Sequence, residues 1–202
     1  MENIKIMADL NLEVTYFEKS GPHNTDKALK IAKKYAEEFN IKDIVIASTS
    51  GTTAEKITEF FNPNEYNLMV VTHSYYFVND TVRQEFPEDK MDSLKNKGLK
   101  FHIGTHSMSG IERGLRIKKE AWIFVDLLAK MIGSQFSQGT KVCIEISATI
   151  CDAGLIPDLN RDIIAIAGTG RGADTVCLIK PAPTSEFKEL RVKAILAKPF
   201  NC

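Results

Sequence analysis

The chain has 202 residues, of which 44% are hydrophobic and 26% are charged. These proportions exclude global disorder and fit a globular protein, so we expect residues 1–202 to form a single domain. Lys and Arg together number 26, as do Asp and Glu. The resulting zero net charge gives no electrostatic reason to bind nucleic acid or an anionic membrane.

No stretch contains the roughly 18 apolar residues that a membrane-spanning helix needs. The first residues, MENIKIMADLNLEV, carry acidic groups and lack the apolar core and cleavage site of a signal peptide. We therefore expect a cytoplasmic protein that does not contact a membrane.

The four cysteines are Cys143, Cys151, Cys177 and Cys202. None forms a CxxC pair, which argues against a zinc site, and disulfides are rare in reducing compartments. We predict a metal-free protein in which Cys143, Cys151 and Cys177 are small buried apolar residues.

The first half of the chain alternates short apolar runs with segments of helical periodicity. Ser20, Gly21 and Pro22 separate the first strand from the first helix, for which Asn24 or Thr25 is a candidate N-cap and Asn40 a candidate stop. The predicted elements in order are a strand at 12–17, a helix from about 25 to 40, a strand at 43–47, a helix at 54–61, a strand at 67–71, a long polar loop at 72–86, a helix at 87–97 and a strand at 99–103.

The second half is less regular. Residues 121–132 have helical spacing, and three further strands are expected at 163–167, 175–179 and 190–197. Residues 142–156 fit both a strand and a helix; their length favours a helix that stops at Gly154.

The order strand–helix–strand–helix–strand, with short apolar strands, is typical of a mostly parallel sheet covered by helices on both faces. We therefore predict a three-layer α/β sandwich.

The first candidate site is the polar turn in DIVIASTSGTTAEKITEFF, residues 43–61. It lies between a buried strand and a helix, where backbone amides, hydroxyls and the helix dipole suit a phosphate. Its residues are Ser48, Thr49, Ser50, Gly51, Thr52 and Thr53. An ordinary helix cap with a turn glycine is the alternative, and the Walker pattern of NTP-hydrolysing proteins is missing.

The second candidate is the glycine-rich segment 168–175 between two strands. Gly168, Gly170 and Gly172 let the backbone wrap a ligand, and Arg171 offers a guanidinium fork to a phosphate. The alternative is a glycine hairpin loop, with Asp174 as a turn residue.

The third candidate follows two predicted strands at the same sheet edge. His106, Ser107 and Ser109 follow the strand at 99–103, and His73 follows the strand at 67–71. Each histidine is either a ligand-binding or general-base group or an ordinary loop residue.

Two carboxylates, Glu145 and Asp152, lie in an otherwise apolar segment. On a helix they would lie near one face, two turns apart. Each has either a structural hydrogen bond to a neighbouring loop or a functional role.

Residues 24–72, NTDKALKIAKKYAEEFNIKDIVIASTSGTTAEKITEFFNPNEYNLMVVT, resemble the C-terminal domain of pyruvate kinase. In that family a helix leads to an apolar strand, a Ser-Gly-x-Thr/Ser-Ala loop, a helix and a strand ending in Val-Thr. Here the loop reads SGTTA. The resemblance implies the fold of that domain and a loop that holds a phosphate, as it does for the sugar bisphosphate activator of the family.

The later stretch DIIAIAGTGRGADTVCLIKPA resembles the last strands of that domain and the other side of its effector site. Together the two stretches cover roughly two thirds of the chain, and residues 73–160 diverge most. The catalytic barrel of pyruvate kinase is absent, so no kinase activity is implied. The chain is similar to stand-alone, mostly archaeal proteins of this domain type, which implies flavin mononucleotide (FMN) as a candidate ligand.

Three functions follow as hypotheses. The first is a binding module for a phosphorylated metabolite or mononucleotide. The second is an enzyme of unknown reaction, flavin-dependent or otherwise, with His106, Glu112 or Arg113 near the reacting atoms. The third is a structural domain that forms a homo-oligomer, since pyruvate kinase C-terminal domains also make subunit contacts.

Overall fold

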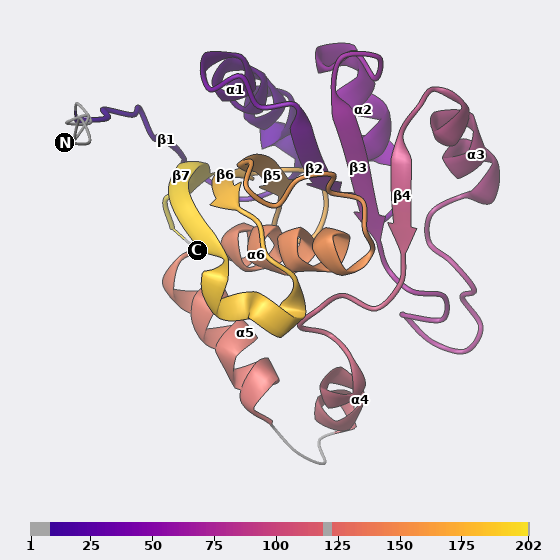
Figure 1. The fold of residues 1–202 in the computed structure, drawn as a ribbon. Coiled ribbons are helices and arrows are strands. Elements are labelled where there is room, and N and C mark those ends of the chain that lie inside the picture. The colour runs from indigo at the N-terminus through magenta and orange to yellow at the C-terminus, as the bar shows by residue number, and fades with distance from the viewer. Residues whose placement is uncertain (1–8, 119–122, 202) are drawn as a thin grey trace.

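The computed structural model describes residues 9–118 and 123–201. Within them, seven strands form one sheet in the order β1-β7-β6-β5-β2-β3-β4 (Figure 1). The strands are β1 (Thr15–Phe17), β2 (Asp43–Ala47), β3 (Asn67–Thr72), β4 (Lys100–Ile103), β5 (Ile163–Ala167), β6 (Thr175–Lys180) and β7 (Arg191–Pro199). The protein is therefore an α/β protein, as the sequence predicts.

The sheet is mostly parallel. β5, β2, β3 and β4 are neighbours and all run in one direction, and β1 runs parallel to β7. Only β6, among the strands described, pairs antiparallel with both of its neighbours, β5 and β7. This reversal follows from the connection between β5 and β6, a short glycine-rich loop in place of a crossover helix.

Helices connect most of the strands. They are α1 (Thr25–Glu38), α2 (Thr52–Phe60), α3 (Glu88–Asn96), α4 (Ile111–Ile117), α5 (Phe124–Gln135) and α6 (Gln138–Asp152), with 3₁₀ helices at Pro22–Asn24 and Thr184–Glu189.

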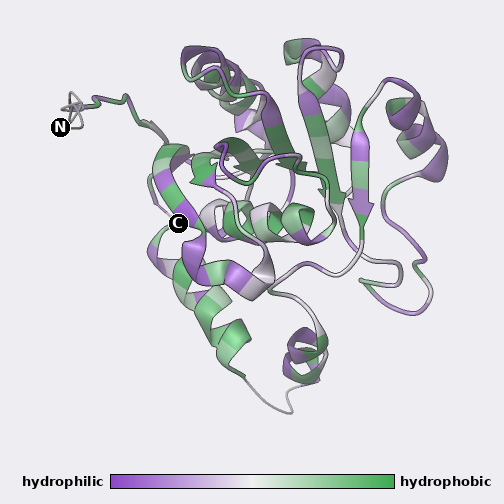
Figure 2. Ribbon diagram, viewed as in Figure 1, coloured by the Kyte–Doolittle hydropathy of each residue, from purple (hydrophilic) through white to green (hydrophobic). Residues whose placement is uncertain are grey.

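The central strands bury apolar side chains on both faces, because successive side chains of a strand point to opposite sides. On β2, Ile44 and Ile46 pack in a cluster with α1, α2 and α3, whereas Val45 packs in a second cluster with α6. Figure 2 shows the hydrophobic residues concentrated on these strands, with hydrophilic residues prominent on α3. The unbroken apolar runs in the sequence arise from this two-sided burial.

Most predicted elements are present with shifted ends. The expected strand at 12–17 is shorter, since β1 pairs with β7 only from Thr15 to Phe17. The ambiguous segment is the helix α6, which ends before Gly154, a glycine with a φ of 67°. Ten of its residues are buried, so apolar residues occur on most sides of the helix and match the spacing of a strand as well as that of a helix.

Two features differ from the sequence predictions. The helix α4 was not predicted: it has only seven residues, and none of them is buried. The helix expected to begin at residue 121 is described from Phe124, and residue 121 itself lies outside the described residues. Within the described ranges, none of the helices has the length and apolar character needed to cross a membrane.

A substitution at Gly139 can test how closely α6 packs against the sheet. A Cβ at this position would overlap Oγ1 of Thr175 on β6 and lie 2.5 Å from its Cβ, and Thr175 is fully buried. We expect Gly139→Ala to lower the free energy of unfolding in urea by about 1–3 kcal/mol through overpacking. Gly114→Ala on α4 is the control, because its Cβ would meet no atom within 4 Å. Equal effects of the two substitutions would contradict the close packing of α6.

Candidate functional site

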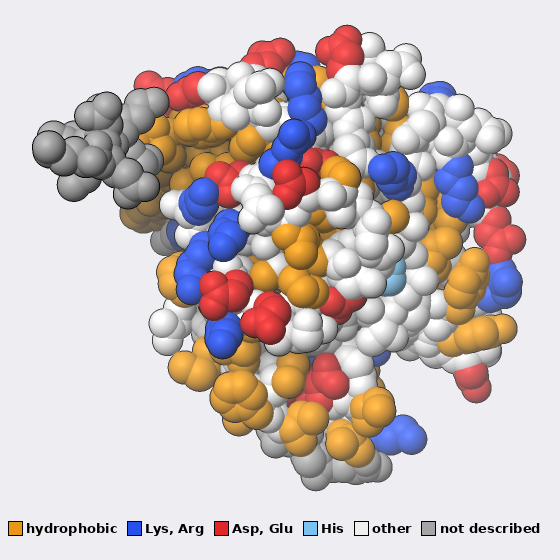
Figure 3. All heavy atoms as spheres, in the orientation of Figure 1, with side chains coloured by type: hydrophobic (Ala, Val, Ile, Leu, Met, Phe, Trp, Pro, Cys, Tyr) orange, Lys and Arg blue, Asp and Glu red, His pale blue; other side chains and the backbone are white. Residues whose placement is uncertain are grey.

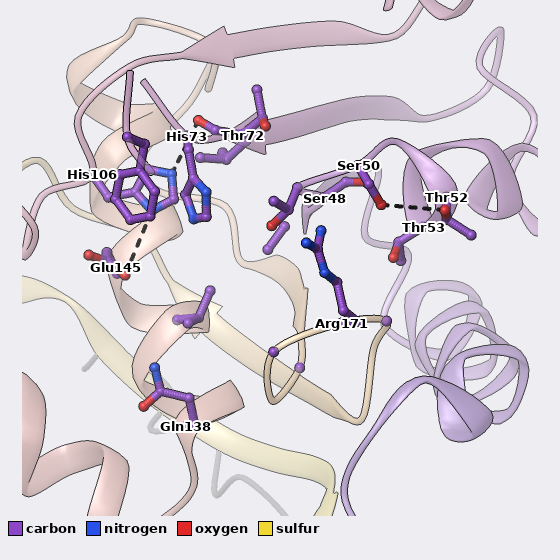
Figure 4. A pocket seen from close by; sticks show the side chains of 18 of the residues that line it. Ser48, Ser50, Thr52, Thr53, Thr72, His73, His106, Gln138, Glu145 and Arg171 are labelled. Carbon is purple, nitrogen blue, oxygen red and sulfur yellow. Dashed lines mark hydrogen bonds and ion pairs between the residues drawn. The ribbon is translucent and has the colours of Figure 1, made fainter. Parts of the chain in front are cut away.

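A pocket of about 740 Å³ lies where the parallel strands end. The carboxyl ends of β2, β3 and β5 meet at this edge because the three strands run in the same direction. Thr25 of α1, Thr52 of α2 and Gln138 of α6 also line the pocket, so three helices begin at its wall. This edge is where open α/β sheets usually bind ligands. Figure 4 shows the lining side chains from close by.

The turn after β2 forms one end of the pocket. Of the first amides of α2, that of Ala54 donates to Oγ of Ser48 (3.2 Å) and that of Glu55 donates to the carbonyl of Gly51 (2.9 Å). The preceding amides, of Thr52 and Thr53, have no acceptor within the helix because they belong to its first turn. Ser50 Oγ lies 3.5 Å from Thr52 Oγ1, so amides and hydroxyls are grouped at one helix N-terminus.

Gly51 corrects an interpretation drawn from the sequence. Its φ of 89° is in the left-handed region, as a turn glycine requires, but it does not line the pocket. A Cβ there would lie 2.5 Å from Cδ of Lys90 and 2.9 Å from the ring of Phe86. A side chain at residue 51 would therefore point toward α3 and not toward a bound phosphate.

The glycine-rich loop 168–174 faces this turn across the pocket. The buried carboxylate of Asp174 anchors the loop, because it accepts hydrogen bonds from the amides of Gly21 (2.9 Å) and Thr169 (3.2 Å). Its other oxygen accepts from the Thr175 hydroxyl at 2.9 Å. Asp174 is therefore more than an ordinary turn residue, since it fixes the loop to the segment before α1.

Arg171 projects from this loop into the pocket. In Figure 4 its guanidinium points toward Ser48 and Ser50. Nη2 lies 3.2 Å from Oε1 of Glu85, with which it forms an ion pair. The side chain is more than half exposed, and a guanidinium has five N–H donors, so donors other than the one paired with Glu85 are left for a ligand at the α2 end.

Two histidines and a carboxylate occupy the opposite end. His106 Nε2 lies 3.2 Å from the carbonyl of Thr72, which only accepts, so Nε2 carries the hydrogen. His106 Nδ1 is 3.8 Å from Oε2 of Glu145. The ring of His73 is centred 5.3 Å from that of His106 and stacks on Phe77 at 3.7 Å.

Glu145 is buried in α6 and forms an ion pair with Lys141 at 3.0 Å. Burial alone would raise the pKa of its carboxyl group, but the interactions with His106 and Lys141 outweigh burial and lower that pKa to about 2. Glu145 is therefore ionised at neutral pH. Its second oxygen, Oε1, is buried without a hydrogen-bond partner among the described residues.

Burial lowers the pKa of two of the histidines. For His73, burial is the main cause, and the neighbouring His106 and Arg113 add to it against the opposing effect of Glu85. For His102 on β4, burial and then His106 lower the pKa. His102 does not line the pocket, and the described residues include no group of three or more His, Cys, Asp or Glu placed to hold a metal.

The pocket wall is rich in cations. Five basic side chains and one carboxylate, that of Glu145, line it within the described part of the chain. The basic residues are Lys56, Arg113, Arg116, Lys141 and Arg171. Four of the five cations are in ion pairs with carboxylates, namely Asp26, Asp126, Glu85 and Glu145. The helix N-termini and Arg113 add further positive charge to the surface that a ligand would meet.

The structure brings together twelve of the fourteen residues expected from the sequence to form the site. The two that do not line the pocket are Gly51 and Ser107. The hydroxyl of Ser107 donates to the carbonyl of Glu145 at 2.9 Å, so it attaches the loop after β4 to α6. The lining residues that were expected are Ser48, Thr49, Ser50, Thr52, Thr53, His73, His106, Ser109, Gly168, Gly170, Arg171 and Gly172.

The other polar candidates have separate roles. Asp152 accepts hydrogen bonds from the amide (3.0 Å) and hydroxyl (2.8 Å) of Thr184, which is the structural alternative considered for it. Glu112 accepts from the amide of Gly110 and does not line the pocket.

Several lining residues were missed. Lys56 and Lys141 each follow one turn after the start of a helix at the pocket wall, and this position is the signal that could have indicated them. Gln138 lies at the first position of α6, whose N-terminus the sequence interpretation did not locate.

The cysteines are free where they are described. Cys143 and Cys177 are fully buried, as predicted, whereas Cys151 is only partly buried. Burial and the nearby Asp152 raise the pKa of the Cys151 thiol to about 12. Cys202 lies outside the described residues.

No protein-family model matches this chain. The fold and the pocket themselves therefore define its class: an α/β protein with a cation-rich pocket at the carboxyl edge of a mostly parallel sheet.

The carboxylate of Glu145 predicts how stability depends on pH. Folding lowers its pKa from the usual 4.5 to about 2, so its stabilisation is complete above pH 4.5 and is lost as the pH falls toward 2. We expect Glu145→Gln to reduce the free energy of unfolding by up to about 3 kcal/mol at neutral pH. The deficit relative to the parent should shrink below pH 4.5, as measured by urea unfolding at several pH values.

Glu59→Gln, an exposed change on α2, is the control and should show no such convergence. A deficit for Glu145→Gln that stays constant with pH would contradict the pairing of Glu145 with Lys141 and His106.

Proposed function

We propose that the protein binds a phosphate-bearing small molecule, with the phosphate at the N-terminus of α2. The observation that carries this proposal is the grouping of the Thr52 and Thr53 amides with the hydroxyls of Ser50 and Thr52, opposite the guanidinium of Arg171. Backbone amides at a helix N-terminus and an arginine fork are the usual partners of phosphate oxygens.

The charge of the pocket supports the same ligand class. The N-termini of α1, α2 and α6 contribute partial positive charge, and Lys56 lies beside the turn after β2. An anionic group is favoured here, and a cationic ligand would be repelled.

The arrangement of the helices supports a more specific proposal for the fold. α1 and α2 pack against one face of the sheet and α6 against the other, as in a three-layer sandwich. We propose that this sandwich is of the pyruvate kinase C-terminal type, in which the loop after the corresponding strand holds a phosphate. The sequence resemblance at residues 24–72 and 162–182 supports this assignment.

FMN is the candidate ligand that this resemblance implies, and the lining residues fit it. The α2 end suits its phosphate, and a pocket of about 740 Å³ lies within the usual size range for small-molecule sites. Phe77 and the ring of His73 form an aromatic wall at the other end. A bound flavin would supply redox chemistry, while the residues of the chain would hold its phosphate and orient its ring.

Binding of FMN, riboflavin and inorganic phosphate, measured by calorimetry, tests the proposal. Riboflavin is the matched ligand because it lacks only the phosphate. We expect FMN to bind at least tenfold more tightly than riboflavin, and Thr52→Val or Arg171→Ala to weaken FMN and phosphate by roughly tenfold, because hydrogen bonds to charged groups contribute about 1.5–3 kcal/mol.

Thr58→Val is the matched control, since Thr58 lies on the same helix and its hydroxyl bonds to the carbonyl of Glu55, away from the pocket. Arg171→Ala should also leave the melting temperature nearly unchanged, because an exposed ion pair adds little stability. If Thr52→Val and Thr58→Val bind phosphate equally well, the phosphate does not lie at α2.

A second candidate, a homo-oligomerisation domain, is favoured by one observation. Phe124, Leu127 and Met131 are exposed at helical spacing on α5, and Figure 3 shows apolar side chains gathered over this helix. Sedimentation of the parent protein should then show association. Leu127→Asp should abolish this association, whereas Lys130→Asp on the same helix should not. A protein that is monomeric at all concentrations would exclude this role.

A further inference from the structure

The histidine end of the pocket contains a group arranged to accept a proton. Nδ1 of His73 lies 3.2 Å from Oε2 of Glu85, and a carboxylate only accepts, so Nδ1 carries the ring hydrogen. This leaves a lone pair on Nε2, which has no hydrogen-bond partner among the described residues. His73 lines the pocket, whereas Glu85 does not.

Contacts to both the ring and the backbone hold His73 in place. Phe77 stacks on it with ring planes 19° apart, and the backbone carbonyl of His73 accepts from the side chain of Gln84 at 3.0 Å. Glu85 is fixed in turn by Arg171, which binds its other oxygen at 3.2 Å. A base held in this way keeps its orientation without the ligand, which is what catalysis requires.

The charged neighbours of His73 come from four segments. Glu85 belongs to the loop after β3, His106 to the loop after β4, Arg113 to α4, and Arg171 to the loop after β5. Beyond His106, α6 contributes the Lys141–Glu145 pair. Burial, His106 and Arg113 together lower the pKa of His73 against the opposing effect of Glu85, which favours the neutral ring that can accept a proton.

We propose that His73 is the general base of an active site and removes a proton from a phosphorylated substrate whose phosphate is held at α2. The substrate class rests on the proposed function. Glu85 is the positioning residue: it fixes the tautomer and stabilises the imidazolium that forms, as carboxylates do in other histidine-based sites.

The step requires no co-reactant. The proton of an O–H, N–H or acidic C–H bond of the substrate passes to Nε2 of His73, and the electron pair of that bond stays on the substrate. The anion formed faces the cationic groups of Arg113 and Lys141, which line the same pocket. Return of the proton to the same or a neighbouring atom restores the neutral imidazole.

The test begins with nuclear magnetic resonance of the full chain labelled at its four histidines, with His73→Gln used only to assign the signals. The nitrogen shifts report both tautomer and pKa. We expect the Nδ1–H tautomer of His73, with a pKa below the ordinary histidine value. Glu85→Gln should lower that pKa further and remove the preference for the Nδ1–H tautomer. Glu88→Gln, which removes the surface partner of Arg83, should leave both unchanged.

A second measurement asks whether Nε2 faces the ligand. Diethylpyrocarbonate acylates neutral imidazoles, so His73 should react at neutral pH. Saturating FMN should block the reaction, whereas inorganic phosphate, bound at the α2 end, should not. Mass spectrometry of peptides locates the modification on the native protein.

An Nε2–H tautomer, or a His73 ring that is protonated at neutral pH, overturns the proposal. So does FMN that binds in calorimetry yet leaves the reactivity of His73 unchanged. If neither FMN nor phosphate binds, the phosphorylated substrate class falls with the proposed function. The tautomer and pKa measured on the free protein still decide separately whether His73 can act as a base.

Discussion

The parallel direction of β5, β2, β3 and β4 is the constraint on which the pocket depends. A parallel connection must return across the sheet before the next strand begins, so each strand ends at the same edge. The loops after β2, β3 and β4, and the N-terminus of α2, therefore gather there. The loop after β5 joins them although it leads into an antiparallel strand, because it turns back at that edge.

Two carboxylates, one fully buried and one partly buried, hold these loops in place. Asp174 accepts from the amides of Gly21 and Thr169, which links the glycine-rich loop to the segment before α1. Glu85 contacts both Arg171 and His73, so one carboxylate connects the two ends of the pocket. Isolated buried charges are costly, and the fully buried Asp174 has the donors that its burial requires.

The two ends of the pocket offer different chemistry. At α2, amides and hydroxyls are fixed by the helix and present hydrogen atoms, which suits an anion that does not react. At the other end, His73 turns its unprotonated Nε2 to the pocket and Phe77 supplies apolar surface. A ligand that spans both ends would be anchored through its anionic group while another part meets the histidines. This division is common in enzymes that use remote binding interactions to position a reacting group.

The sequence by itself determined the local features of this protein. Short unbroken apolar runs indicated the strands β2, β3 and β5, and a polar turn with a glycine indicated the start of α2. Both patterns could be recognised because they depend on neighbours only a few residues away in the chain. Only the tertiary structure decided which residues distant in the sequence are in contact. It directs a side chain at Gly51 toward Phe86, attaches Ser107 to α6, and brings Lys141, Glu145 and His106 together from distant segments. The pairing of Glu85 with His73 crosses a loop without regular structure, where no periodicity constrains the chain. Such contacts depend on the packing of the whole sheet, and no local pattern encodes them.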